Sequence, residues 1–225
     1  MRRIPAFFLS LLLLLTSYST TTTLFSQAQQ LLDNRGSEFL VGFLPNLFGA
    51  TLEIHLTGDV ATTVRVEYPV GTTLYAAESV VPGTVNILNI PATAASGWNP
   101  NSVTTDNLVR LVATDGSTEF TAYLFNRRRF SSDAAMALPV DTMNLDYMVM
   151  DYEPRFAFSS LALVYAAFNA TDVLIQPSAD SRLPPFEIQL DRGEGYLIRA
   201  SDSLTGTLIS STKPVGVSNG NVCTT

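Results

Sequence analysis

The sequence predicts an all-β fold of two tandem β-sandwich-like repeats that follow an N-terminal export signal. Short apolar runs alternate with a period of two through residues 29–225, and most are bounded by Gly, Pro, Asn or Asp. This is the strand-and-turn pattern of an all-β domain. Two groups of these runs recur about 108 residues apart, as expected for an internal duplication. A partial β-propeller, with two blades from each repeat, is the alternative architecture.

Residues 1–28 predict a cleaved signal peptide. Arg2 and Arg3 precede the apolar run Phe7–Leu15, and Ser26-Gln27-Ala28 places small residues at the −3 and −1 positions of a cleavage site. The apolar run of about nine residues is shorter than the roughly 20 that a membrane-spanning helix needs. We therefore expect a secreted or cell-surface protein without a stable membrane span.

The first repeat, residues 29–140, is predicted to consist of short half-buried strands. In one run, Ile54 and Leu56 flank His55, so the histidine is expected on the solvent face. The predicted strands are Leu52–Leu56, Val64–Tyr68, Val85–Ile90, Leu108–Val112 and Phe120–Leu124. Turns are expected at Pro82-Gly83 and Asp115-Gly116. Ser131–Ala137 is the one segment expected to hold a helical turn.

The second repeat, residues 141–225, carries a similar series of runs. Its predicted strands are Tyr147–Met150, Leu161–Ala166, Val173–Ile175, Phe186–Ile188, Tyr196–Ile198, Thr207–Ile209 and Val215–Val217. The first repeat closes with Ala137-Leu138-Pro139, and the second has no equivalent ending. The second repeat is therefore expected to be C-terminally incomplete, with an unpaired strand edge.

Two pairs of segments support the duplication. Glu38–Val41 recurs as Asp146–Val149, and Ala61–Val66 recurs as Ala170–Ile175 at almost the same offset. Between these anchors, Leu52–Leu56 matches Leu161–Tyr165. After them, Thr84–Ile90 is expected to match Phe186–Leu190 with a shift in register. The interpretation is two copies of one β-unit of about 100 residues.

Charge and cysteine content restrict the partners. The chain has 13 Lys and Arg against 20 Asp and Glu, a net charge of −7. An acidic chain of this kind is not expected to bind nucleic acid, whose affinity comes largely from phosphate neutralisation. The single cysteine, Cys223, cannot form a disulfide within the chain. It predicts either a disulfide-linked oligomer or a partner cysteine beyond this sequence.

No constellation of reactive groups points to catalysis. A Ser–His–Asp triad would need His55, the only histidine, and no Gly-x-Ser-x-Gly elbow accompanies it. No zinc-ligand spacing, phosphate loop or dinucleotide pattern is present in the sequence. We therefore expect no enzymatic activity and no cofactor.

Three further features qualify as candidate sites. Asp141, Asp146 and Asp151 lie near the junction of the repeats and form a weak Ca²⁺ candidate, although a solvated acidic linker is the favoured interpretation. The basic run Arg127, Arg128 and Arg129 is a candidate ligand contact, and a charged turn that blunts a sheet edge is favoured over it. Asn169-Ala170-Thr171 is a glycosylation sequon in a predicted turn.

The C-terminal motif carries a family resemblance. Leu204, Thr205, Gly206 and Thr207 are followed by Lys213, Pro214 and Val215, and then by Gly220 and Cys223. This pattern resembles the N-terminal domain family of IgGFc-binding protein. Weaker similarities occur at Gly36–Phe39, Ala137–Pro139 and Leu190–Glu194, so that the resemblance extends over residues 36–223.

The resemblance implies an extracellular binding or adhesion module, and it does not imply that immunoglobulin is bound. The motif residues themselves are interpreted as structural: Gly206 and Gly220 allow backbone angles or close approaches that other residues resist, and Pro214 opens a strand without needing an amide donor.

The leading functional hypothesis is an extracellular module that recognises protein or glycan ligands through its surface. The first alternative is a carbohydrate-active enzyme or lectin-like domain with an acidic cleft. The second is a structural spacer of a larger surface protein.

Overall fold

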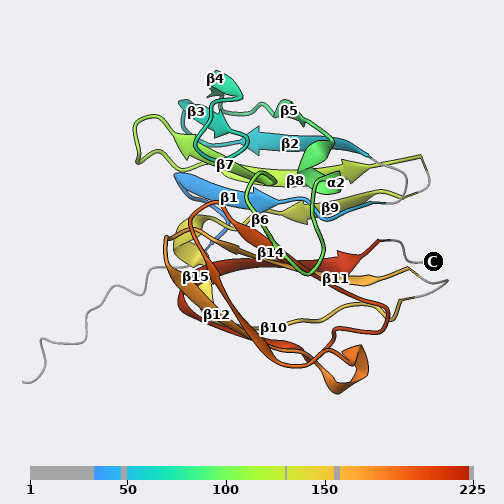
Figure 1. The fold of residues 1–225 in the computed structure, drawn as a ribbon. Helices are drawn as coiled ribbons and strands as arrows, with labels where there is room; N and C mark the ends of the chain where they lie inside the picture. Colours follow the sequence, from blue (N-terminus) through green and yellow to red (C-terminus); the bar gives the residue numbers. More distant parts are fainter. Residues whose placement is uncertain (1–32, 47–49, 130, 155–157, 223–225) are drawn as a thin grey trace, which may run out of the picture. The chain divides into compact units, whose positions relative to one another are not determined.

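Strands carry almost all the regular structure in the computed structural model of this chain (Figure 1). The structure describes residues 33–46, 50–129, 131–154 and 158–222. The predicted all-β class is confirmed. The predicted signal peptide and Cys223 lie outside the described residues.

The first repeat forms two four-stranded antiparallel sheets. One sheet has the order β1 (Glu38–Gly42), β7 (Leu108–Ala113), β3 (Thr62–Glu67) and β4 (Tyr75–Val80). The other has the order β5 (Asn86–Ile90), β2 (Thr51–Thr57), β8 (Thr121–Arg127) and β9 (Asp133–Met136). Alternate residues such as Ile54, Leu56 and Val64 are fully buried in one core, as expected of a sandwich.

The second repeat is built around one long strand. Its strands are β10 (Asn144–Met148), β11 (Ser160–Ala166), β12 (Thr171–Gln176), β13 (Phe186–Leu190), β14 (Gly195–Ala200) and β15 (Leu208–Asn221). The N-terminal half of β15 pairs with β10 and β12, and its C-terminal half pairs with β11. Ile209 in the first part of β15 and Val215, where the pairing with β11 begins, are both buried in the second core.

Strand pairing identifies the N-terminal half of β15 as the counterpart of β7. In the first repeat, Leu111 of β7 pairs with Phe39 of β1 and Val66 of β3. In the second repeat, Ile209 pairs with Tyr147 of β10 and Ile175 of β12. The register is thus the same on both sides of the strand.

The C-terminal half of β15 is likewise the counterpart of β8. Ile54 of β2 pairs with Leu88 of β5 and Leu124 of β8, and Val164 of β11 pairs with Tyr196 of β14 and Val217 of β15. The expected match of Leu52–Leu56 with Leu161–Tyr165 was wrong by one residue, because Ile54 and Val164 each face the core of their own repeat. The β7–β8 connection of the first repeat is absorbed into one continuous strand in the second.

The continuous strand corrects two expectations. Thr207–Ile209 and Val215–Val217 were expected as separate strands, and Pro214 was expected to open the second of them. Pro214 instead lies within β15, between Ser211, the last residue paired with β12, and Val215, the first paired with β11. Because the ladder changes partners there, a residue without an amide donor is tolerated in the strand interior.

Two other local expectations were wrong. Phe186–Leu190 does not correspond to Thr84–Ile90: it forms β13, which pairs with β12 as β4 pairs with β3. Ser131–Ala137 holds no helical turn, because Asp133–Met136 pairs with β8 as an edge strand. The short helix of the first repeat is α2 (Thr93–Ser96), which alternation did not indicate.

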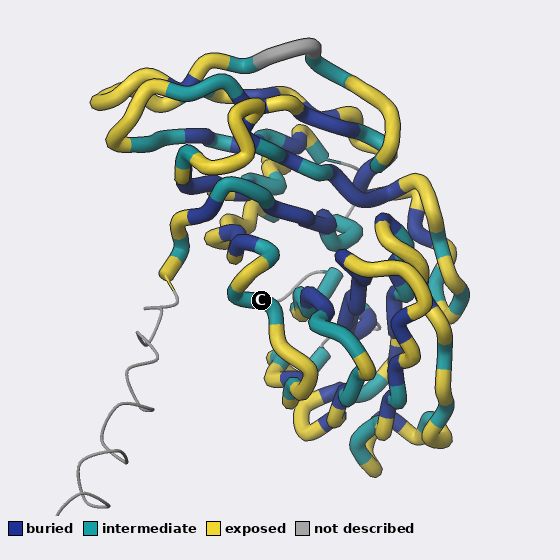
Figure 2. The backbone as a smooth tube through the Cα atoms, turned by 90° about the vertical axis from the view of Figure 1, so that its left-hand side faces the viewer, coloured by how far each residue is buried: buried dark blue, intermediate teal, exposed yellow. Residues whose placement is uncertain are grey.

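The repeats share a third core cluster. Leu40 and Leu108 of the first repeat pack with Leu161, Leu163 and Leu197 of the second, and all are at most 2 % exposed. The whole of β11 is therefore buried, since its alternate side chains face this shared cluster and the second core. Figure 2 shows burial concentrated along the strands and exposure at the turns.

Trp98 is the central side chain of the contact between the repeats. It is 6 % exposed, and its Nε1 donates a hydrogen bond to the carbonyl oxygen of Phe43 at 2.8 Å. Its ring lies against Gly195 of β14, where an added Cβ would stand 2.9 Å from the ring. Beyond Trp98, the short strand β6 (Val103–Thr104) pairs with β14, so the first repeat adds a strand to the sheet of the second.

Charged groups join the repeats beside this cluster. Glu38 of β1 accepts hydrogen bonds from Arg110 of β7, at 2.8 Å, and from Arg192 of the second repeat. Partial burial raises the pKa of Glu38, but these two guanidinium groups outweigh it and hold the pKa below its ordinary value. Arg192 belongs to the Leu190–Glu194 segment of the family resemblance, and this part of the resemblance therefore lies at the contact between the repeats.

Substituting Gly216 by Ala is expected to lower the free energy of unfolding by about 1–3 kcal/mol, the usual cost of overpacking a core. An added Cβ would stand 2.1 Å from the ring of Tyr165, which is buried and cannot move aside. Urea unfolding followed by circular dichroism measures the change. Gly220→Ala in the same strand is the control, since its Cβ would stand 3.3 Å from the flexible end of Leu44. Equal losses in both variants would contradict the argument.

Candidate functional site

A polar cleft of about 350 Å³ lies between the two repeats. Leu44–Asn46, Asn126 and Ser131–Asp133 of the first repeat face Met150–Tyr152 and Asn219–Val222 of the second. The walls come from the segment after β1, the β8–β9 connection, the segment after β10 and the end of β15. Distant parts of the sequence therefore meet there, and the site arises only when the repeats pack together.

Asparagine amides hold the walls of the cleft in place. On the first-repeat side, Nδ2 of Asn46 donates to Oδ1 of Asn126 at 2.9 Å, and Nδ2 of Asn126 donates to the carbonyl of Leu44 at 2.9 Å. On the second-repeat side, the amides of Asn219 and Asn221 donate to the carbonyls of Met150 and Tyr152. On both sides of the cleft, the side-chain amide of an asparagine near the end of a strand holds the neighbouring loop by a hydrogen bond to its main chain.

One acceptor at the cleft has no hydrogen-bond partner among the described residues. Oδ1 of Asn221 is buried and unsatisfied, while Nδ2 of the same side chain donates to Tyr152 at 3.0 Å. An unsatisfied buried oxygen carries a free-energy cost, which a donor from a ligand or an ordered water would remove. Beside it, Tyr152 is 77 % exposed and Met150 is 74 % exposed. The cleft thus combines hydrogen-bonding groups with an exposed aromatic and thioether surface.

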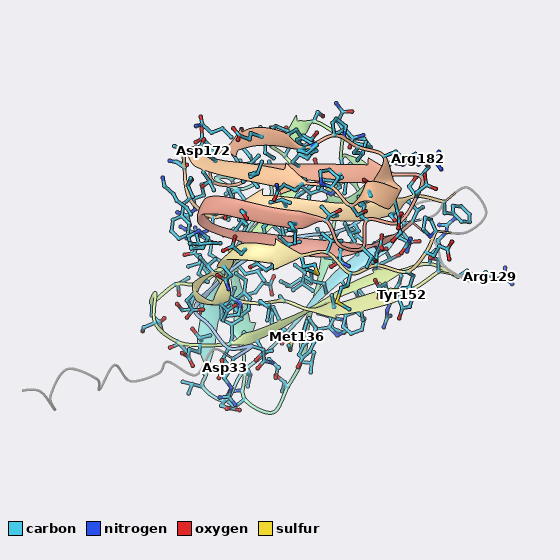
Figure 3. The ribbon with its side chains drawn as sticks, turned by 90° about the horizontal axis from the view of Figure 1, so that it is seen from below. Asp33, Arg129, Met136, Tyr152, Asp172 and Arg182 are labelled. Atoms are coloured by element: carbon cyan, nitrogen blue, oxygen red, sulfur yellow. The ribbon has the colours of Figure 1, made fainter. Side chains whose placement is uncertain are left out.

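The basic run borders this cleft. Arg127 ends β8, where its guanidinium lies 5.5 Å from the centre of the Phe125 ring and 3.5 Å from a Glu53 oxygen. Arg128 accepts a hydrogen bond from Ser132, a cleft residue, at its carbonyl oxygen. In Figure 3, Arg129 and Tyr152 lie at the same side of the molecule. The arginine run therefore lies at the rim of the cleft. Its role as a ligand contact remains a prediction.

The three acidic residues of the Ca²⁺ candidate have separate environments. Asp141 is the exposed residue of the 3-10 turn Val140–Thr142, and Asp146 of β10 accepts a hydrogen bond from Ser210 at 2.7 Å. Asp151 is engaged by the loop before β15. In the described part of the chain, no group of three or more His, Cys, Asp or Glu side chains is arranged to hold a metal ion. The Ca²⁺ interpretation therefore has no support from this geometry.

Asp151 organises the Leu-Thr-Gly-Thr motif. Its carboxylate accepts hydrogen bonds from Ser203 Oγ at 2.8 Å, from the Leu204 amide at 3.0 Å and from Thr205 Oγ1 at 2.6 Å. Partial burial raises the pKa of Asp151, but hydrogen bonds from Ser160 and from this loop outweigh burial and hold it below its ordinary value. The loop is thereby fixed to the end of β10.

The remaining motif residues also make structural contacts. Gly206 has a φ of +89°, which favours glycine, and its amide donates to the carbonyl of Val149 at 2.9 Å. Leu204, Thr207 and Val215 are fully buried. The motif positions the start of β15 against β10, in agreement with its interpretation as a fold device.

Lys213 and the sequon meet on the surface away from the cleft. The ammonium of Lys213 donates to the carbonyl of Asn169, and Oδ1 of Asn169 accepts from the Arg192 amide at 3.0 Å. Asn169 is exposed in the turn between β11 and β12. The turn is thus observed, and glycosylation of Asn169 remains a prediction.

His55 lies on the outer face of β2, in contact with Phe125 and Glu53. It lies opposite the buried Ile54 and Leu56, as alternation predicts, but the outer face is less open than expected. Its side chain is 17 % exposed, stacks on Phe125 at 4.2 Å between ring centroids and contacts Glu53 at 2.9 Å. The histidine therefore contributes to packing on the outer face of β2.

Sequence reasoning missed the residues that build the cleft and the contact between repeats. Asn46, Asn126, Tyr152 and Asn221 carry no periodic pattern, because each lies at a strand end or in a connection. Trp98 is the only tryptophan of the chain, and its position in Gly97-Trp98-Asn99-Pro100 is the one signal that marked it for attention.

Comparison with known proteins supports the resemblance for the second half of the chain. Residues 133–225 match the family model described as IgGFc binding protein. The resemblance is confirmed for this segment, which begins at β9 and contains most of the cleft residues, while Gly36–Phe39 lie outside it. No curated protein and no solved structure matched the chain. Among the described residues, no helix has the length and apolar character needed to cross a membrane.

Proposed function

We propose that this protein is a non-catalytic extracellular recognition module whose ligand, a segment of another protein, binds at the cleft between the repeats. The match of residues 133–225 to the IgGFc binding protein family supports a binding role and an extracellular location. The observation that carries the choice of site is the cleft itself, where an unsatisfied amide oxygen lies beside exposed apolar surface.

The composition of the cleft fits a protein ligand. The polar groups that line the cleft can form hydrogen bonds with a main chain, whereas Met150 and Tyr152 offer the adaptable apolar contact that dominates the energy of protein interfaces. The arginine run at the rim provides positive charge on an otherwise acidic chain. Rim charges of this kind affect the rate and the salt dependence of association more than the final affinity.

The proposal is tested by binding measurements on arrays of extracellular proteins, including immunoglobulin Fc, and of glycans. We expect binding to a protein that Tyr152→Ala and Asn221→Ala each weaken by about tenfold or more, the range of an interface hot spot. Phe168→Ala is the matched control: Phe168 is 42 % exposed but lies at the other end of β11 from the cleft. Binding only to glycans, or equal weakening by all three variants, would contradict the proposal.

A further inference from the structure

The outer face of the β5–β2–β8–β9 sheet of the first repeat carries exposed apolar side chains. The inner face of this sheet packs in the first core through residues such as Ile54 and Leu124, so their neighbours along each strand point outward. One row of outward residues runs straight across the sheet from β5 through β2 and β8 to β9: Ile87, His55, Tyr123 and Met136.

The exposed apolar residues of this face lie in that row and in the row beside it. We call them the outer patch. Each is between 37 % and 58 % exposed, and they are Val85, Ile87, Tyr123, Met136 and Leu138. A contiguous group of exposed apolar side chains on a sheet face marks an interaction surface, because a monomer gains nothing by leaving it in water.

The equivalent face of the second repeat is covered. The register places Tyr165 of β11 where His55 lies in β2. Gly195 of β14 likewise takes the place of Ile87. In the second repeat, Tyr165 packs in the cluster that both repeats share, and the ring of Trp98 lies against Gly195. The same face is thus a packing surface between repeats in one copy of the unit, and it is exposed in the other.

Charge restricts what can cover the outer patch. The chain has a net charge of −7, but the patch itself contains no charged residue. Glu53 and Arg127, the charged residues of the same face, lie toward the other end of the strands and pair with each other at 3.5 Å. Two copies of this acidic chain can therefore bring these faces together without placing like charges opposite each other.

We propose that the outer patch is a self-association surface, on which a second copy of this chain packs the same face about a two-fold axis. Face-to-face packing of antiparallel sheets is the arrangement already used inside the first sandwich. A two-fold contact needs only one self-complementary surface, and an uncharged apolar row across a sheet is such a surface.

The two-fold contact leaves the cleft accessible. Asn126, the β8 residue that lines the cleft, lies near the end of that strand, whereas the outer patch lies over its first half. The dimer would present two clefts to a ligand and would gain avidity for a target with two binding segments. The dimer itself does not depend on the ligand proposed for the cleft.

Self-association is tested by sedimentation velocity over a concentration series, in reducing buffer so that Cys223 forms no disulfide. We expect a reversible equilibrium between monomer and dimer. Ile87→Glu and Met136→Glu are each expected to raise the dimer dissociation constant by about tenfold or more, because each places an unpaired charge in an apolar contact.

Met148→Glu is the matched control. Met148 is 64 % exposed and pairs with Leu208 on β10 and β15 of the second repeat, so the same change is made in a comparable exposed apolar environment away from the outer patch. Far-UV circular dichroism and urea unfolding establish that each variant is folded. If a glutamate variant does not fold, Ile87→Ser takes its place, with Met148→Ser as its control.

Three results would overturn the proposal. The first is a protein that stays monomeric at all concentrations. The second is a dimer that Met148→Glu weakens as much as Ile87→Glu does. The third is growth beyond the dimer into longer assemblies, which a two-fold contact through one face does not permit. None of these results bears on the cleft, which is tested separately by Tyr152→Ala and Asn221→Ala.

Discussion

Replacing Trp98 by Ala is expected to lower the free energy of unfolding by about 3–5 kcal/mol, the range for removing a large buried aromatic side chain. The indole packs with leucines of both repeats and satisfies the carbonyl of Phe43 with its Nε1 proton. Its removal would leave a cavity in the shared cluster and one buried acceptor without its donor. The measurement is chemical unfolding followed by circular dichroism, since the variant has no tryptophan to report by fluorescence.

The Trp98→Ala variant is also expected to unfold less cooperatively than the wild type. Because Trp98 lies in the cluster shared by the repeats and not in the separate core of either one, the variant is expected to unfold in a broader or two-step transition. Trp98→Phe is the control: it retains most of the apolar volume, so a smaller loss is expected. A change below about 0.5 kcal/mol in Trp98→Ala would contradict the role assigned to this contact.

Replacing Asp151 by Asn is expected to cost about 1.5–3 kcal/mol at neutral pH, the range for hydrogen bonds to a charged acceptor. The carboxylate accepts hydrogen bonds from Ser203, Leu204 and Thr205. The side-chain NH2 group of asparagine would point toward one or more of these donors and could not accept from them. The loop that positions β15 would therefore be loosened. Thermal unfolding across a pH series measures the effect, with the exposed Asp141→Asn as the control.

The stabilisation that the Asp151 carboxylate provides is expected to decrease in acid. The folded-state pKa lies below the ordinary value of 3.8, so the stabilisation is fully present above pH 3.8 and is lost as the pH falls through the lower folded-state value. The difference between wild type and Asp151→Asn should consequently be largest near neutral pH and shrink in acid. A difference that grew as the pH fell would contradict the assignment.

The alternation of apolar and polar residues predicted β2 well, because one face of this strand is buried and the other is not. In β2, the alternation of Leu52, Ile54 and Leu56 with polar residues gave the correct bounds to within one residue. The reason is that a side-chain period of two is imposed by the pleat whenever only one face packs on a core. The same logic failed to separate the faces of β11, which is buried on both.

Expectations failed where the environment of a segment depends on strands distant in sequence. Asp133–Met136 has two adjacent alanines and no clear alternation, and only pairing with β8 makes it a strand. Pro214 is compatible with a strand interior only because β15 changes its neighbour from β12 to β11 there. Neither fact is encoded in the local pattern of apolar residues.

The amino-acid sequence by itself determined the all-β class, the duplication and the family resemblance of the C-terminal motif, because periodicity, turn residues and repeated segments are local properties. Only the tertiary structure showed that β15 takes the places of both β7 and β8 in the second repeat, that Trp98 packs between the repeats and that Asn221 lines a cleft. These features depend on which strands become neighbours, and that choice is made by the packing of whole sheets and not by the residues within any one strand.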